Sequence, residues 1–274
     1  MAIKFRSFSS GSCGNCYFLG SFDDAGECVA AIVIDAGVSP RRTKRYLQEQ
    51  GLCFDNLDCM IITHDHHDHI GSLGSWCKLV GIPVWATPEL NRAMSHRYEI
   101  KGPCYPSCRK NLSEDWNDIV PGHVRVRYFV VPHDATQTLG YAVLIDGYRF
   151  VIMTDIGKMT PQALSFAKQA QTVVIESNYD TDMLWSGPYP EELKVRITSG
   201  SGHLSNAECA EAVREFMHEG LDNIFLCHLS DHNNTARLAL EPTRAVLDSL
   251  DPAPQRVPRV VPLPREVPSP LFTL

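Results

Sequence analysis

The first 35 positions alternate between short apolar runs and turn residues, a pattern typical of antiparallel β-strands. Three runs rich in aromatic and β-branched residues lie between residues 3 and 35, and serines and glycines separate them. From Pro40 the spacing becomes helical, and we expect this helix to end at Gly51, because glycine readily adopts the backbone conformation found just past helix ends. A fourth apolar run at 59–62 then predicts another strand.

The second half starts again with strands and returns to helices. Thr160 and Pro161 supply an N-cap and a first helical residue, and Ser205 with Glu208 forms a capping box. Because both halves combine strands with helices, the pattern predicts an α+β architecture of two facing sheets with helices outside. Residues 101–118 show no clear period and are expected to form a loop. The other expected elements are helices over 70–79 and 88–98 and starting at 161, 206 and 236, and strands over 83–86, 123–131, 139–145, 148–154, 172–176 and 223–227.

Length and composition predict one large domain and a short tail. The 274 residues are 44% hydrophobic and 21% charged, which is enough to bury a real core, so residues 1–250 are expected to form one domain. From Asp251 the chain becomes rich in proline, which favours an extended conformation without a core of its own. For this tail, 251–274, a wrapping arm, a ligand for an unknown partner and disorder all remain open.

Composition also narrows the class of protein. The N-terminus has no basic start followed by a long apolar run, and no stretch approaches 18 apolar residues, so we expect a cytoplasmic protein without a membrane partner. The ten cysteines are scattered through apolar runs and are expected to be mostly small buried side chains rather than disulfides. A net charge of −7 argues against a surface that is basic overall, as in many nucleic-acid-binding proteins. It is compatible with a local basic segment, at 41–45 or 92–110.

The densest chemistry lies in the stretch T-H-D-H-H-D-H at 63–69, directly after the fourth strand. Six titratable side chains at the end of a buried strand lose their contacts with water, which costs free energy unless a partner replaces those contacts. A bound cation can be that partner. In extended chain, residues two apart point the same way, so His64 and His66 form a pair. If the chain then turns into a helix, Asp68 and His69 come back beside them and can hold a second ion within about 3.5–4 Å of the first.

Further ligands are expected at other strand ends. His133, Asp155 and His228 each follow a strongly apolar run directly. Any one of them alone is more often an ordinary residue at a strand end than a ligand. The three together, in the order His, Asp and His after T-H-x-H-x-D-H, predict that distant parts of the chain complete the metal site.

This order of motifs resembles the metallo-β-lactamase fold, an αββα sandwich of two facing mixed sheets with helices outside. The resemblance implies two divalent metal ions, Zn²⁺ or Mn²⁺, and a metal-bridging hydroxide as nucleophile. It also places Asp35 as a brace for the metal loop. One ion would take His64, His66 and His133, the other Asp68, His69 and His228, and Asp155 would bridge them.

Three local features resemble a nuclease branch of this fold. Glu176 in I-E-S-N-Y-D, followed by His203 in S-x-x-G-H and the terminal His228, resembles the β-CASP nucleases without their inserted domain. The segments F-S-S-G-S-C-G-N, R-I-x-S-x-x-G-H-L-S-N and H-L-S-D-H-N-N resemble the YycJ/WalJ-like branch of DNA exonucleases. His203 is expected to protonate the departing oxygen or clamp the phosphate, with Glu176 holding its ring. Asn15 and Asn233 are candidate substrate-binding residues.

These features together predict a binuclear metal-dependent phosphodiesterase, a DNA exonuclease with Asp68, His203 and Glu176 among its catalytic groups. DNA is favoured over RNA as the nucleic acid partner. Two alternatives remain: an ester, thioester or lactone hydrolase on the same fold, and a non-catalytic metal-binding regulatory protein. The fold alone does not choose among them, because it hosts many reactions.

Overall fold

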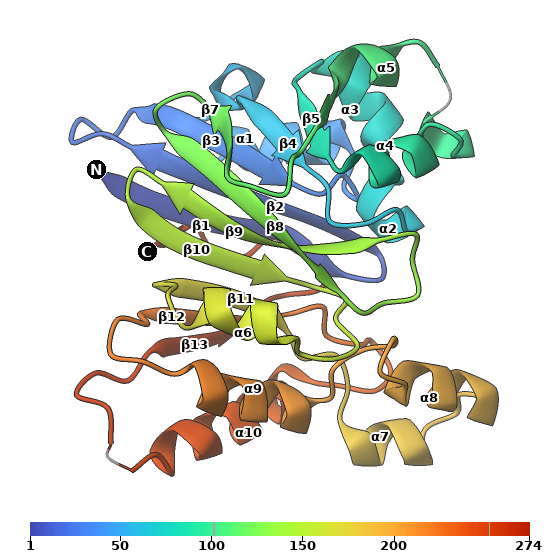
Figure 1. The fold of residues 1–274 in the computed structure, drawn as a ribbon, viewed down its shortest axis with the longest axis vertical. Coiled ribbons are helices and arrows are strands. Elements are labelled where there is room, and N and C mark those ends of the chain that lie inside the picture. The colour runs from blue at the N-terminus through green and yellow to red at the C-terminus, as the bar shows by residue number, and fades with distance from the viewer. Residues whose placement is uncertain (101, 252) are drawn as a thin grey trace.

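The computed structural model describes residues 1–100, 102–251 and 253–274, and within them the chain forms two seven-stranded mixed sheets that face each other, with helices on the outside (Figure 1). This is the predicted architecture. Both sheets combine antiparallel pairs with a parallel half. In spatial order the first sheet contains β14 (Phe272–Thr273), β1 (Ala2–Gly11), β2 (Gly14–Phe22), β3 (Cys28–Ile34), β4 (Cys59–Ile61), β5 (Val84–Ala86) and β6 (Arg109–Asn111).

The second sheet mirrors this arrangement and carries its own helical layer. Its spatial order is β13 (Arg259–Pro262), β12 (Asn223–Cys227), β11 (Thr172–Glu176), β10 (Tyr148–Met153), β9 (Thr138–Ile145), β8 (Val124–Val131) and β7 (Asn117–Val120). The α-helices are α1 (Pro40–Gln48), α2 (His67–Ile70), α3 (Leu73–Leu79), α4 (Pro88–Met94), α5 (Cys104–Cys108), α6 (Pro161–Ala167), α7 (Thr181–Ser186), α8 (Glu191–Thr198), α9 (Asn206–Phe216) and α10 (Ala236–Asp248).

Aromatic side chains join the two sheets. The ring of Phe5 on β1 lies 5.3 Å from that of Phe150 on β10 and 4.9 Å from that of Phe225 on β12. All three side chains are buried, and such tilted pairs add to the stabilisation that burial of their apolar area supplies. A second apolar cluster, which includes Phe129 and Phe216, lies between the second sheet and its helices.

The parallel strands bring the functional side chains to one edge. In β3 and β4, and in β10, β11 and β12, the strands run the same way, so the loops after them leave from the same edge of their sheet. β8 is antiparallel to β9, which is antiparallel to β10, so the end of β8 lies there too. Loops at the carboxyl ends of parallel strands are where sites on such folds assemble.

The structure differs from the sequence-based expectation in several places, and the helix expected over 88–98 ends at Met94. The predicted loop over 101–118 contains α5, β6 and the start of β7, because neighbouring strands β5 and β8 pair with these short segments; Lys101 lies outside the described residues. The helix expected over 70–79 is split into α2 and α3. The short helices α7 and α8 were not predicted, since their few turns leave too little pattern to detect.

The proline-rich segment crosses the molecule and joins both sheets. β13 pairs in parallel with β12, and β14 pairs antiparallel with β1. Of the alternatives that the sequence left open, the structure shows the wrapping arm, while the domain boundary at 250 stays a prediction. No helix among the described residues is both long and apolar enough to cross a lipid bilayer.

Candidate metal centre

The loop after β4 projects two histidines to one side, as the spacing predicted. The backbone stays extended through His66, the residue before α2, and the rings of His64 and His66 lie 4.7 Å apart. Asp65 points the other way, where its carboxylate accepts hydrogen bonds from Thr136 and Arg97 at 2.9 Å each. These contacts hold the loop in place from its far side.

Asp35 braces the same loop from the end of β3. Its carboxylate accepts hydrogen bonds from the backbone and the hydroxyl of Thr63, both at 2.8 Å, and lies 2.8 Å from Nδ1 of His69. All three residues are completely buried. A carboxylate on one ring nitrogen of a histidine fixes the tautomer and leaves the other nitrogen free to bind a metal. The structure thus places Asp35 as the resemblance implied.

Asn15 of the β1–β2 hairpin and Gly37 of the loop after β3 pack directly on the helical turn that carries Asp68 and His69. A Cβ atom on Gly37 would lie 1.8 Å from the carbonyl oxygen of Asp68, so only glycine permits this approach. The amide of Asn15 donates to a carboxylate oxygen of Asp68 at 3.0 Å, and its nitrogen lies 2.8 Å from Nε2 of His69. Asn15 is therefore buried against two predicted ligands, and its role in substrate binding stays a prediction.

The remaining predicted ligands arrive from three other strand ends. His133 follows β8, Asp155 follows β10 and His228 follows β12. One carboxylate oxygen of Asp155 lies 3.1 Å from Nε2 of His69, and the other lies 3.4 Å from Nδ1 of His228 and 3.7 Å from Nε2 of His133. Residues that are far apart in the chain thus converge on the histidines of the β4 loop.

Backbone strain marks the same positions. Asp35, Asp155 and His228 all have positive φ, at 62°, 54° and 54°. Side chains other than glycine rarely adopt this conformation, and such strain persists only where the surrounding structure enforces it, commonly at functional sites.

The donor atoms fit a pair of metal ions. Nε2 of His64, His133 and His228 is buried and has no hydrogen-bond partner in the described part of the chain, which is costly for a polar atom unless a ligand completes it. His133 uses its other nitrogen, Nδ1, to donate to the carbonyl of Gly202 at 2.8 Å. Two groups of donor atoms, each within 4.8 Å of one another, correspond to the predicted sets: His64, His66 and His133, and Asp68, His69 and His228.

The electrostatics of the centre keep His64 neutral and favour positive charge beside the carboxylates. Burial and the neighbouring His69 lower the pKa of His64. Burial alone would favour the neutral ring of His228 too, but Asp155, Asp68 and Glu176 raise the pKa of His228 to about 10. The carboxylates that hold a proton there would equally hold a divalent cation, since both compensate the same buried negative charge.

Glu176 and His203 form the contact that the sequence predicted. Glu176 is completely buried at the end of β11, and one of its carboxylate oxygens lies 2.8 Å from Nδ1 of His203 and 2.9 Å from Nδ1 of His228. Although burial opposes a charged ring, Glu176 raises the pKa of His203. Asn178, which sequence reasoning missed, donates to the carbonyl of His228 at 2.8 Å and lies 3.3 Å from Glu176.

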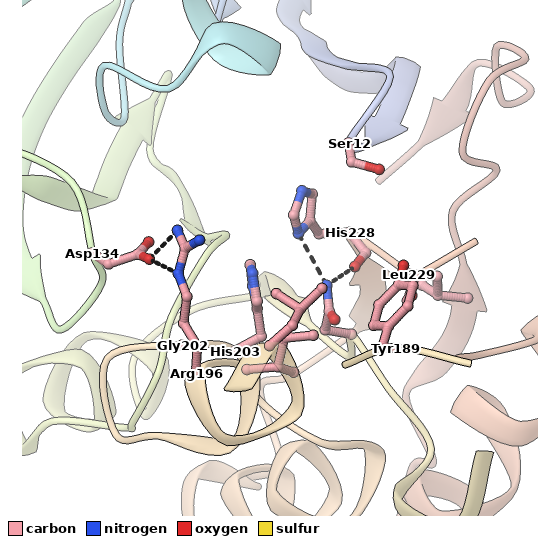
Figure 2. Close-up of a pocket in the computed structure, with 12 residues that line it drawn as sticks. Ser12, Asp134, Tyr189, Arg196, Gly202, His203, His228 and Leu229 are labelled. Carbon is pink, nitrogen blue, oxygen red and sulfur yellow. Dashed lines mark hydrogen bonds and ion pairs between the residues drawn. The ribbon is translucent and has the colours of Figure 1, made fainter. Parts of the chain in front are cut away.

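A cavity of about 230 Å³ opens beside these residues (Figure 2). Asp134 and Arg196 form an ion pair at its rim, and Figure 2 shows the guanidinium of Arg196 facing Asp134 while His203 and His228 point into the space between the walls. Sequence reasoning missed both residues of the pair. The available signals were the position of Asp134 directly after His133 and the place of Arg196 at the start of R-I-x-S-x-x-G-H.

Asn233 does not meet the metal ligands. It is buried, its amide nitrogen lies 3.4 Å from the hydroxyl of Ser230, and its backbone carbonyl accepts a hydrogen bond from Asp180. Ser230 lines the cavity, and among the described lining residues Asn233 is absent. Asn233 therefore supports the cavity wall, and its predicted contact with substrate stays a prediction.

The chain is similar in sequence to known proteins. Residues 30–224 match the family model described as the β-lactamase superfamily domain. The chain is 30% identical over 248 residues to exodeoxyribonuclease YycJ of Bacillus anthracis, covering 90% of both chains. It is 32% identical over 240 residues to exodeoxyribonuclease WalJ of Streptococcus pneumoniae, covering 87% of this chain and 86% of that one.

Solved structures share the fold at lower identity. The metallo-β-lactamase fold protein YhfI from Bacillus subtilis superimposes with a TM-score of 0.69 at 15% identity, covering 98% of both chains. Yeast PDE1 superimposes with a TM-score of 0.70 at 12% identity, covering 99% of this chain and 100% of that one. These likenesses support the arrangement of the two sheets and their helices.

Proposed function

Because this chain belongs to the metallo-β-lactamase superfamily and carries buried His/Asp clusters, we propose that it is a binuclear metal-dependent phosphodiesterase that degrades DNA as an exonuclease. The observation that carries the proposal is the convergence of buried donor atoms beside a cavity with Arg196 at its rim. The names of the relatives YycJ and WalJ support DNA as the substrate.

In this proposal the ligand sets are those that the resemblance implied. His64, His66 and His133 would hold one ion, Asp68, His69 and His228 the other, and Asp155 would lie between them. Zn²⁺ or Mn²⁺ suits these nitrogen and oxygen donors. Two such ions supply an activated water at neutral pH and neutralise charge that develops on a phosphate.

His203 is the proposed proton donor to the departing oxygen. Its Nδ1 is engaged by Glu176, which fixes the ring and leaves Nε2 for the substrate. A general acid must keep its proton near neutral pH and lie beside the leaving group, and Glu176 favours the protonated ring. Glu176 also accepts the backbone N–H of Ile156 at 2.9 Å, so its own position is fixed.

Arg196 is the proposed phosphate-binding residue. Its side chain is 63% exposed, and Asp134 holds it at the rim of the cavity. A guanidinium presents paired donors that match phosphate oxygens, and a substrate phosphate would compete with Asp134 for them. Beside it the wall carries the hydroxyls of Ser12, Tyr189 and Ser230. Leu193, Ile197 and Leu229 also line the cavity, so the preference for a phosphodiester over an acyl ester or lactone rests on Arg196 and these hydroxyls.

The test is digestion of duplex and single-stranded DNA labelled at either end. The purified chain, loaded with Mn²⁺ or Zn²⁺, should release mononucleotides progressively from one end. The Asp155→Asn and His203→Ala variants, prepared in the same way, guard against a contaminating nuclease, because a contaminant would persist in all three preparations.

Two outcomes would contradict the proposal. Turnover of thioesters or lactones without DNA cleavage would assign the site to the other hydrolases of this fold. A protein that binds two equivalents of metal but cleaves no phosphodiester would be a metal-binding regulatory protein instead.

A further inference from the structure

A second groove lies on the outer face of the second sheet, far from the metal centre. It has a volume of about 530 Å³, and Trp116, Arg125, Arg127, Arg149 and Phe166 line it. Arg149 is the second residue of β10, whereas Asp155 follows the end of that strand. Six residues of extended chain span about 20 Å, so the groove and the metal centre are at opposite ends of the sheet.

Strand register gathers the arginines. Leu144 on β9 pairs with Arg125 on β8 and with Arg149 on β10, so these side chains form one row on the same face of the sheet. Arg127 lies in the next row on that face, beside Ala142. In Figure 1 the helices α6, α9 and α10 of this layer gather toward the β11–β13 side, and α6 supplies Phe166 to one wall of the groove.

The three arginines lack acidic partners. Among the described residues, no carboxylate lies within 4.0 Å of the guanidinium groups of Arg125, Arg127 or Arg149, although Asp118 is the cross-strand neighbour of Arg125. Within the described ranges, the hydrogen bond of Arg127 goes to the backbone carbonyl of Glu114 at 3.1 Å. β9 separates Arg125 from Arg149, so their charges add to a positive field over this face of the sheet, which attracts an anion. The clustering of these three arginines in one groove contrasts with the net charge of the chain, which is −7.

Aromatic rings accompany the charges. The guanidinium of Arg125 lies 5.6 Å from the ring of Trp116, and that of Arg127 lies 5.9 Å from the ring of Phe166. Trp116 is 36% exposed, which leaves part of its ring open to a ligand. Exposed rings between cationic side chains are the elements with which proteins bind single-stranded nucleic acid, through base stacking and phosphate contacts.

We propose that this groove binds a single-stranded segment of nucleic acid, with phosphates against Arg125, Arg127 and Arg149 and a base against Trp116. That this nucleic acid is DNA rests on the proposed function. The binding of a single strand to the groove does not depend on that function. An acidic peptide would satisfy the arginines but gain little from the open indole ring, so the pairing of rings with cations favours a nucleotide chain.

The test is binding of a fluorescent oligothymidylate of about 12 nucleotides, within the site sizes of single-strand binders. Measurement by fluorescence anisotropy in EDTA prevents cleavage. Trp116→Ala should weaken binding by about 10-fold or more, and Trp116→Tyr should restore most of it because a stacking ring remains. Arg244→Ala, which removes an exposed arginine of α10, is the matched control and should leave binding unchanged.

The salt dependence gives a second readout. Each phosphate contact with a single strand contributes about 0.7 to the slope of log affinity against log salt, so the double variant Arg125→Ala/Arg149→Ala should lower that slope by about 1.4. Hydrolysis of bis(p-nitrophenyl) phosphate, which is too small to span both sites, should be unchanged in these variants and reports an intact metal centre.

The inference is overturned if Trp116→Ala and the double arginine variant bind the oligonucleotide as the unaltered chain does, or if polyglutamate competes as well as the oligonucleotide. The latter result would assign the groove to an acidic protein partner. If the chain binds the oligonucleotide through Trp116 but cleaves no DNA, the proposed function is wrong and this inference still holds.

Discussion

Replacing Asp155 with asparagine tests whether this carboxylate joins two metal ions. The substitution keeps the shape of the side chain but removes the negative charge that lies 3.1 Å from His69 and 3.4 Å from His228. Asparagine tolerates positive φ, so the backbone at 54° should be unaffected. The change therefore acts on charge and metal affinity rather than on the fold.

The expected magnitude follows from linkage between metal binding and folding. An ion that is present at a thousand times its dissociation constant stabilises the folded chain by about 4 kcal/mol. One kcal/mol shifts the melting temperature of a domain of about this size by about 2–4 °C. If Asp155→Asn loses one of two ions, the increase in melting temperature on adding metal should fall by about 8–16 °C.

Scanning calorimetry with and without metal, together with elemental analysis after dialysis, measures both quantities. Asp146→Asn is the matched control, because Asp146 also has positive φ, at 44°, and lies 3.0 Å from a histidine nitrogen, His123 Nδ1, at a turn outside the centre. Two equivalents of tightly bound metal in Asp155→Asn, with an unchanged metal-dependent shift, would refute the bridging role of Asp155.

Three further substitutions have distinct expected outcomes. His203→Ala should keep both ions and lower kcat by about 100-fold or more, as for loss of a general acid, and a drop in metal content would instead make His203 a ligand. Arg196→Ala should raise KM for DNA by about 10-fold with little change in kcat, since a charged hydrogen bond to the bound phosphate is lost, whereas the exposed Arg214→Ala should change neither. Gly140→Ala should cost about 1–3 kcal/mol in denaturant unfolding, because its Cβ would lie 2.2 Å from the buried ring of Phe129, and an unchanged midpoint would show that the ring can move aside.

Local pattern alone was enough to predict most elements and the His and Asp side chains at the ends of their strands. Alternation of apolar residues and the capping signals at Thr160 and Ser205 predicted strands and helices that the structure contains. The pair His64 and His66 could be predicted because side chains two apart in extended chain point the same way, whatever the rest of the fold does. Short, weakly patterned segments, such as α5 and β6, were misjudged as loop because only their neighbours in space stabilise them.

The sequence by itself determined where apolar and polar positions alternate, where strands end and which side chains can bind a metal. These properties depend on neighbours a few positions away in the chain. Only the tertiary structure decided which strand ends meet. It pairs Asp134 with Arg196 across 62 positions, brings Gly37 against the carbonyl of Asp68, and sets Arg125 and Arg149 on either side of Leu144. Such contacts depend on sheet order and register, which local periodicity does not encode.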